Sequence, residues 1–298
     1  MEPGQVLVME PVLERELRPK IGWAYQVKWD GIRMLSFIHP HQVQLQTKGG
    51  RVRWGQFQEL NALSCLTKDK PLILDGELVA LHEGRAEFTL ILKRNWGNHD
   101  HIPIWYMIFD ILMYQGEDLR QRPLAERQEI ITSLKLPGPR FVPVENFVDG
   151  EALLSKTKEL NWEGIVAKDL QSPYVPGKSS HWEKRKNILQ EKLVVVGYIE
   201  KDGQLASLLL AKDFGQGLQY AGAVGSGFAS NQRRKLLGVL PQIKLDSPNW
   251  GLKKKPGWNW LKPILQAEVQ FSEWTPEMVV RAPVFKSLWM GEKRIELS

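Results

Sequence analysis

A short string near the start of the chain combines a lysine, a carboxylate, a glycine and an arginine. It reads Lys28-Trp29-Asp30-Gly31-Ile32-Arg33. We expect a strand over Trp23–Lys28 to deliver the lysine and Asp30-Gly31 to turn the chain into the next strand, so that Lys28 and Arg33 face one pocket. A lysine at a strand end, partly desolvated and near other cations, has a lowered ammonium pKa and becomes an amine nucleophile. The alternative is an Asp-Gly hairpin with solvated neighbours.

Four further strings carry charged or aromatic residues. They are Asp75-Gly76-Glu77-Leu78, Phe109-Asp110-Ile111-Leu112, Glu163-Gly164-Ile165-Val166-Ala167-Lys168 and Trp182-Glu183-Lys184-Arg185-Lys186. Lys184 and Lys186 are two residues apart, so one face of a strand presents both. Together the strings provide a nucleophilic lysine, two carboxylates for a divalent cation, an aromatic platform and a pair of cations. This set suits attack on a nucleoside triphosphate. Taken singly, each string also fits solvated strand ends, a core phenylalanine or a surface charge run.

The elements that position these strings alternate between β-like runs and helical stretches. We expect strands over Trp23–Lys28, Ile32–Ile38, Val43–Thr47, Pro71–Leu81 and Ile104–Met113, the first three as neighbours, and helices over Trp54–Leu66, Leu124–Leu134 and Glu151–Leu160. The order indicates an α+β domain.

After residue 187 the pattern changes to strands separated by glycines. We expect strands over Leu193–Glu200, Leu205–Ala211, Leu218–Val224 and Ile264–Trp274, with one helix over Asn231–Leu240. Several short strands and one helix in roughly 110 residues are typical of a small all-β barrel, of which the oligonucleotide-binding (OB) barrel is a common instance. We therefore predict domains over residues 1–189 and 190–298, with residues 172–180 as a competing linker.

Composition sets the broad class of the protein. The chain has 298 residues, of which 43% are hydrophobic and 25% charged, as expected of a folded soluble protein. A single cysteine, Cys65, excludes an intrachain disulfide and favours a reducing compartment. We predict no membrane span and no secretion signal. Residues 1–189 hold 25 basic and 24 acidic side chains and residues 190–298 hold 15 and 10, so the C-terminal part hints at a polyanionic partner.

In their order and spacing the five strings resemble the motif series of covalent nucleotidyltransferases, and specifically of ATP-dependent DNA ligases. Further strings, Ser172-Pro-Tyr-Val-Pro-Gly, Tyr220-Ala-Gly-Ala-Val-Gly-Ser-Gly-Phe228 and Arg281-Ala-Pro-Val-Phe-Lys286, look most like the ligase module of bacterial ligase D, the end-joining enzyme. The resemblance covers nearly the whole chain. It implies an ATP-grasp-like α+β nucleotidyltransferase domain for adenylation, followed by an OB-fold barrel.

The resemblance also implies roles for single residues. Lys28 would take AMP as a phosphoramidate, and Lys184 with Lys186 would contact the α-phosphate as further catalytic residues. Glu163 would bind the metal, Mg²⁺ or Mn²⁺, with Glu77 as a second metal partner. The residues expected to bind ATP are Arg33 and Glu77 at the ribose, Phe109 stacked on adenine, Lys48 and Lys168.

The chain departs from the family pattern in three places. Gln26 stands where the family usually has Glu, and Lys48 replaces an arginine in Thr47-Lys48-Gly49-Gly50. The terminal Arg-x-Asp-Lys string, which orients the pyrophosphate leaving group in the family, is absent. Either self-adenylation is slow, or Lys293 or Arg294 substitutes.

By resemblance, the chain is expected to seal 5′-phosphate/3′-hydroxyl breaks in DNA during repair and end joining. The expected partner is nicked or broken duplex DNA, a Ku-type end-binding protein is a candidate partner, and the protein is expected to be a monomer in the bacterial cytoplasm, associated with the nucleoid. Two alternatives stay open: an RNA ligase or GTP-using capping-type enzyme, and a catalytically silent nucleic-acid-binding relative.

Overall fold

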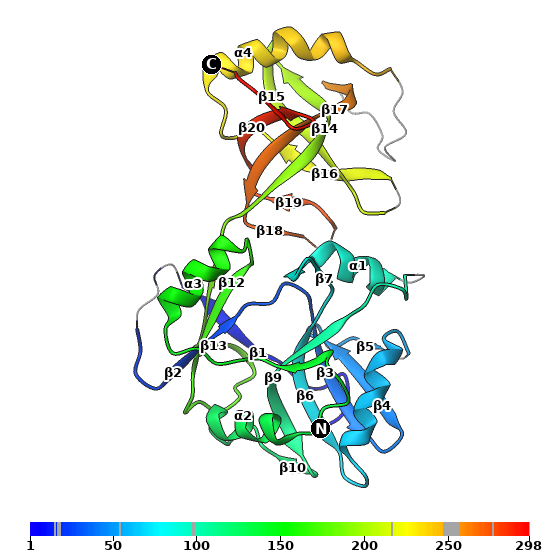
Figure 1. Cartoon of the computed structure of the whole chain (residues 1–298), viewed down its shortest axis with the longest axis vertical. Coiled ribbons are helices and arrows are strands. Elements are labelled where there is room, and N and C mark those ends of the chain that lie inside the picture. Colours follow the sequence, from blue (N-terminus) through cyan, green and yellow to red (C-terminus); the bar gives the residue numbers. More distant parts are fainter. Residues whose placement is uncertain are drawn as a thin grey trace. The chain divides into compact units, whose positions relative to one another are not determined.

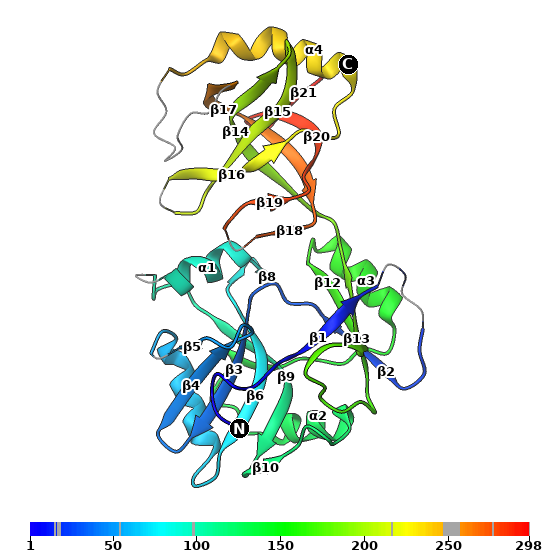
Figure 2. The same cartoon turned by 180° about the vertical axis from the view of Figure 1, so that it is seen from behind.

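The protein is described here from a computed structural model of the chain (Figures 1 and 2). The structure describes residues 1–14, 16, 19–53, 55–96, 99–215, 217–246, 257–275 and 277–297. The chain divides into two compact units, Met1–Asn187 and Ile188–Ser298.

Unit 1 contains two main sheets. The smaller has the order β1-β13-β12-β2, and the larger has the order β10-β9-β6-β3-β4-β5, with β11 also paired to β9. The strands of the smaller sheet are β1 (Met9–Leu13), β2 (Trp23–Val27), β12 (Gly164–Asp169) and β13 (Gly177–Lys186). Those of the larger are β3 (Ile32–His39), β4 (Gln42–Thr47), β5 (Val52–Arg53), β6 (Leu72–Val79), β9 (Trp105–Tyr114), β10 (Glu117–Asp118) and β11 (Phe141–Pro143).

Helices and a short hairpin complete unit 1. They are the 3₁₀ helix η1 (Gln58–Leu66), the helices α1 (Phe88–Trp96), α2 (Leu124–Ser133) and α3 (Gly150–Glu159), and the hairpin β7 (Leu81–His82) with β8 (Arg85–Ala86).

The expected strands and the helices over α2 and α3 are confirmed within a few residues. The segment expected as an amphipathic helix over Trp54–Leu66 is instead 3₁₀ from Gln58, and Trp54 lies outside the described residues. The helix α1 was not predicted, although five of its nine residues are apolar, because it is short and lies between two β-like runs.

One prediction about the sheet is wrong. The strands Trp23–Lys28 and Ile32–Ile38 were expected as neighbours, but β2 pairs with β12 in the smaller sheet and β3 pairs with β4 and β6 in the larger. Asp30-Gly31 therefore carries the chain from one sheet to the other, and an Asp-Gly hairpin is excluded. A period-2 pattern defines a strand and its buried face but not its partner.

Apolar side chains fill the space between the two sheets of unit 1. This cluster includes Met9 and Trp182 from the smaller sheet and Leu35, Ile73 and Leu112 from the larger. A second cluster packs the other face of the larger sheet against η1, α1 and α2, and a third packs α3 against β2 and β12. The smaller sheet is thus held on both faces, which fixes the ends of its strands.

Unit 2 is a barrel. Its sheet has the order β16-β15-β14-β17-β20-β21, and a parallel bridge between Ser226 and Val284 joins the segment after β16 to β20. The elements are β14 (Leu189–Lys201), β15 (Gln204–Asp213), β16 (Leu218–Val224), α4 (Ser230–Val239), η2 (Leu240–Ile243), β17 (Trp258–Phe271), β18 (Glu273–Trp274), β19 (Val280–Arg281), β20 (Val284–Met290) and β21 (Lys293–Ile295).

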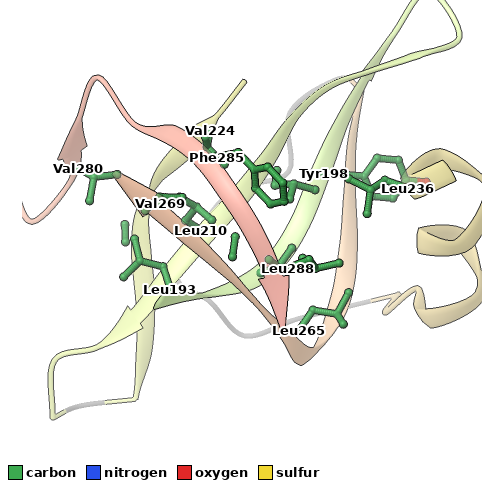
Figure 3. Close-up of a cluster of buried hydrophobic side chains, with 14 of the residues drawn as sticks. Leu193, Tyr198, Leu210, Val224, Leu236, Leu265, Val269, Val280, Phe285 and Leu288 are labelled. Carbon is green, nitrogen blue, oxygen red and sulfur yellow. The ribbon is translucent and has the colours of Figure 1, made fainter. Parts of the chain in front are cut away.

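The interior of this barrel is apolar. Figure 3 shows side chains from several strands and from α4 turned into one cluster, among them Leu193, Leu210, Leu236, Val269 and Phe285. The order of the strands, the closing bridge and the helix α4 after β16 are those of an OB fold. The two units, an α+β unit followed by an all-β barrel, agree with the predicted fold class. No helix among the described residues is long and apolar enough to cross a membrane.

Candidate active site

The expected nucleophile, Lys28, lies directly after β2. Its backbone N–H donates to the carbonyl of Gly164, 2.9 Å away, which ties the end of β2 to the start of β12. A Cβ on Gly31 would overlap the carbonyl oxygen of Leu78, so only glycine allows the chain to pass this close to β6. The string therefore holds Lys28 and Arg33 at the edge of the space between the two sheets.

Lys28 and Glu163 form an ion pair. Lys28 Nζ lies 2.6 Å from Glu163 Oε2, and Lys186 Nζ lies 3.1 Å from Glu163 Oε1. Glu163 is only 6% exposed. A buried carboxylate is expensive unless it is paired, and here each of its oxygens has a cationic partner.

The pKa of Lys28 differs from the sequence-based expectation. Burial opposes its charge, but the carboxylates of Glu163, Glu77 and Asp30 outweigh burial, and the pKa of Lys28 is raised. The predicted lowering of this pKa is wrong for the free protein. The sequence showed a lysine among cations, whereas the fold places a carboxylate against its amine.

Lys184 shows the lowered pKa that was expected of Lys28. Burial, together with the nearby charges of Lys28, Lys186 and Lys48, lowers the pKa of Lys184. The structure therefore brings these four lysines together, although Lys48 comes from the other sheet. Lys48 is also paired with Glu10 at 2.5 Å, and its side chain is 55% exposed. Such a group of cations can offset the charge of a polyphosphate.

Arg33 is held in place by a buried carboxylate. Its guanidinium donates to both oxygens of Asp75, at 3.0 and 2.6 Å, and to the carbonyl of Met9 at 2.6 Å. The hydroxyl of Tyr174 donates to Asp75 Oδ2 at 2.7 Å. Arg33 lies directly opposite Glu77 in the pairing of β3 with β6, so the two side chains share a face.

Glu77 is unlike Glu163. Burial raises the pKa of Glu77 to about 8, although Lys28 and Arg33 act in the opposite direction. The carboxyl is therefore largely protonated at neutral pH and can donate a hydrogen bond.

Phe109 lies at the border of the core between the sheets, where it is half-buried. Its ring meets Trp182 edge-on, with centroids 6.0 Å apart. Lys168 Nζ lies 4.3 Å from the centre of the Phe109 ring and 4.1 Å from that of Trp182. Arg33 also lies over Phe109, at 5.1 Å. The aromatic residue and the two cations expected at a nucleotide are thus in contact with one another.

Lys168 is buried without a hydrogen-bond acceptor among the described residues. Burial lowers its pKa to about 7, since the carboxylates of Asp110 and Asp75 are offset by Arg33 and Arg127. Asp110 itself is committed to Arg127 in a fully buried pair at 2.7 Å. Arg33 and Arg127 are each hydrogen-bonded to a carboxylate, whereas Lys168 has no such partner among the described residues.

Sequence reasoning missed Asp75, Tyr174 and Asn187. A carboxylate inside the apolar run Leu72–Leu78 was a signal for a buried ion pair, but its partner Arg33 is on another strand. Tyr174 lies in the string Ser172-Pro-Tyr-Val-Pro-Gly, but nothing in that string indicated its bond to Asp75, and Asn187 carried no local signal. Of the residues that depart from the family pattern, Gln26 is buried and donates to Asn146 at 2.8 Å. Lys293 and Arg294 lie on β21 of unit 2.

A divalent cation at this site would need oxygen ligands, and the carboxylates of Glu163 and Glu77 are the candidates. Among the described residues there is no group of three or more His, Cys, Asp or Glu side chains that could hold a metal ion. Mg²⁺ is commonly bound by one or two carboxylates together with substrate phosphates and water. Glu163 fits such a site once a triphosphate is present, whereas Glu77, whose pKa burial raises to about 8, would have to lose its proton to become a second ligand.

Comparison with known families gives two matches. Residues 11–186 match the ATP dependent DNA ligase domain, and residues 201–289 match the ATP dependent DNA ligase C terminal region.

Among curated proteins, the multifunctional non-homologous end joining protein LigD of Mycolicibacterium smegmatis is 32% identical over 276 residues, covering 89% of this chain and 36% of that protein. The LigD protein of Pseudomonas aeruginosa is 33% identical over 291 residues, covering 92% of this chain and 34% of that protein. The chain thus spans about a third of the length of these relatives.

Among solved structures, mycobacterial DNA ligase D complexed with ATP and MES is similar, with a TM-score of 0.59 and 26% identity. The match covers 99% of this chain and 98% of that chain.

Proposed function

Since this chain belongs to the ATP-dependent DNA ligase family, we propose that it seals breaks between a 5′-phosphate and a 3′-hydroxyl through an AMP group carried on Lys28. We further propose that residues 1–189 are the adenylation domain and residues 190–298 the OB-fold domain. The observation that carries the proposal is the arrangement around Lys28, where one amine meets a buried carboxylate at 2.6 Å and lies within a group of lysines.

In the first step, the Lys28 amine attacks the α-phosphorus of ATP. A nitrogen–phosphorus bond forms, the bond from the α-phosphorus to the bridging oxygen breaks, and pyrophosphate leaves. Lys28 must first lose a proton to water; without ATP, its ammonium group donates a hydrogen bond of 2.6 Å to Glu163 Oε2. Lys184 and Lys186 offset the charge that develops on the α-phosphate.

A divalent cation held by Glu163 and the phosphates would supply positive charge that favours both the neutral amine and the departing pyrophosphate. We propose Mg²⁺ or Mn²⁺ for this role, with Glu163 as its protein ligand. Glu77 is then proposed as a ribose contact, because a protonated carboxyl donates to a hydroxyl.

The nucleotide is proposed to bind between the two sheets of unit 1. Arg33, fixed by Asp75, and Glu77 opposite it would hold the ribose. Phe109 would stack on adenine, with Lys168 beside the ring. Lys48 would complete the group of cations around the phosphates.

In the later steps AMP passes from Lys28 to the 5′-phosphate at the break, and the 3′-hydroxyl then attacks that phosphate and releases AMP. No co-reactant beyond ATP is needed. The net basic charge of residues 190–298, 15 basic against 10 acidic side chains, supports duplex DNA as the substrate.

We also propose a biological context. The curated relatives are end-joining proteins, and this chain corresponds to about a third of their length. A role in end-joining repair, a Ku-type end-binding partner, a monomeric state and a place at the bacterial nucleoid follow as proposals. An RNA ligase, a GTP-using capping enzyme and a silent binding protein are not favoured by the family matches.

The test is incubation of the protein with α-labelled ATP or GTP and Mg²⁺, followed by addition of a nicked duplex. We expect a labelled protein band with ATP alone, and its loss with formation of sealed DNA when the duplex is added. Labelling by GTP, or no labelling with either nucleotide, would reject the proposal. Nicks with RNA at the 3′-hydroxyl strand distinguish a preference for DNA from one for RNA.

A further inference from the structure

Glu163 is carried by a short irregular segment between α3 and β12. Asn161 in this segment has φ 54°, in the left-handed region, and Gly164 has φ 138°. A Cβ at Gly164 would overlap the carbonyl oxygen of Arg185, so glycine is required there. Because the segment is neither helix nor strand, contacts from elsewhere must fix its conformation.

Asn187 makes three such contacts. Its backbone N–H donates to the carbonyl of Glu163 at 2.7 Å. Its side-chain Nδ2 donates to the carbonyl of Trp162 at 3.0 Å and to Thr157 Oγ1 at 3.0 Å. One amide thus joins the end of α3 to the peptide just before Glu163.

The anchor that Asn187 uses is rigid. Thr157 is fully buried on α3, and its hydroxyl donates to the carbonyl of Leu154 at 2.9 Å. The carbonyl of Thr157 accepts from the N–H of Trp162 at 2.8 Å. Both backbone polar groups of Trp162 are therefore hydrogen-bonded, the N–H to the Thr157 carbonyl on α3 and the carbonyl to Asn187.

The two neighbours of Glu163 in the chain contact the string that contains Lys28. The ring of Trp162 lies 5.4 Å from the ring of Trp29, the residue after Lys28. The carbonyl of Gly164 accepts from the N–H of Lys28. Trp162 and Gly164, the two neighbours of Glu163, thus contact Trp29 and Lys28, while Asn187 binds the carbonyls of Trp162 and Glu163.

We propose that Asn187 is a positioning residue for the adenylation step. It does not touch the carboxylate of Glu163, but it fixes the two peptides on either side of the Glu163 Cα and so directs the carboxylate toward Lys28 and Lys186. The inference rests on the proposed role of Glu163. Asn187 is also the last residue of unit 1, so the backbone that orients this carboxylate is adjacent to the join between the units.

The experiment compares the full chain with Asn187→Ala and Asn187→Asp. The second variant keeps the volume of the side chain and removes both donors. We expect the rate of lysyl-AMP formation at saturating ATP to fall about 10- to 100-fold, since loss of a group that orients a catalytic carboxylate has effects of this size. The ATP concentration for half-maximal rate should change less than about 3-fold, because the Asn187 side chain contacts none of the residues proposed to bind the base or the ribose.

Asn259→Ala is the matched control. Asn259 is half-buried in unit 2 and likewise donates through Nδ2 to a backbone carbonyl, that of Gly257 at 3.2 Å. It should leave the rate unchanged. In the free protein, without ATP or metal, amide hydrogen exchange of the segment 160–165 should accelerate in both Asn187 variants and not in Asn259→Ala.

A double-mutant cycle with Glu163→Gln decides between positioning and general stability. If Asn187 acts through Glu163, adding Asn187→Asp to Glu163→Gln produces no further loss. Two outcomes would overturn the inference. One is a double variant whose loss of adenylation rate is the product of the two single losses. The other is an Asn187→Asp variant that is adenylated at the rate of the unsubstituted protein. If Asn187→Ala does not fold, the cycle is read from Asn187→Asp alone. If neither ATP nor GTP labels the unsubstituted protein, the proposed function itself is wrong, and this result is distinct from those of the Asn187 variants.

Discussion

Lys28 Nζ lies 2.6 Å from Glu163 Oε2, and 135 positions of sequence separate the two residues. In the free protein this pair raises the pKa of the proposed nucleophile and so holds it as an ammonium ion. The same carboxylate is the proposed metal ligand. Binding of ATP with a cation is therefore expected to remove the charge that keeps Lys28 protonated at the moment when a free amine is needed.

Replacement of the nucleophile tests the covalent step. Lys28→Ala should abolish labelling by α-labelled ATP, because it removes the proposed nucleophile. The protein should stay folded but melt at a lower temperature, because buried Glu163 keeps Lys186 and loses its other cationic partner. Lys178→Ala, on the exposed part of β13, is the control and should label normally. Labelling of Lys28→Ala at the unsubstituted rate would remove Lys28 from this role.

The two carboxylates should respond differently to metal. Glu163→Ala should lose at least about 100-fold in adenylation rate and recover part of it at high Mn²⁺, since a ligand is missing from the cation. Glu77→Ala should show a raised ATP requirement that metal does not relieve. The measurement is a metal titration of the labelling rate for each variant. Equal rescue of both by Mn²⁺ would show that the roles are divided wrongly.

Lys168 should make stability depend on pH. Its pKa is lowered to about 7 in the folded protein, from 10.5, so above pH 7 the unfolded chain binds more protons than the folded one. The contribution of Lys168 to stability therefore rises with pH from about 7 to 10.5, by about 2 kcal/mol between pH 7 and pH 9.

Comparison with Lys168→Met isolates this effect. The free energy of unfolding of Lys168→Met minus that of the unsubstituted protein should be largest at pH 7 and fall by about 2 kcal/mol at pH 9. Urea unfolding at both pH values measures it. A difference that does not change with pH would mean that Lys168 titrates normally.

Removal of one partner of the buried ion pair Asp110–Arg127 should strongly lower the stability of the protein. Both side chains are fully buried, with Arg127 Nε 2.7 Å from Asp110 Oδ1, so Arg127→Met leaves a buried carboxylate without its cationic partner. We expect a loss of roughly 3–5 kcal/mol in the free energy of unfolding. The double variant Asp110→Leu with Arg127→Met should lose markedly less, because no charge is stranded. Urea denaturation of the three proteins checks this, and equal losses would contradict it.

Much of this protein could be read from its sequence. Short β-like runs located the strands that carry Glu77 and Phe109 and the strand that ends just before Lys28, and the glycine-separated strands after residue 187 predicted a barrel. Local spacing sufficed because strand propensity and residue type are properties of short segments. The order of the five strings was enough to indicate the family that the domain matches support.

Only the tertiary structure decided how these residues act on one another. It placed β2 and β3 in different sheets, which turned an expected hairpin into a crossing between layers. It set Glu163 against Lys28, and so reversed the expected direction of the Lys28 pKa. It assigned Asn187 to the segment that carries Glu163. Pairing of strands, burial and electrostatic interaction depend on residues far apart in the chain, and no local pattern in the sequence encodes those distances.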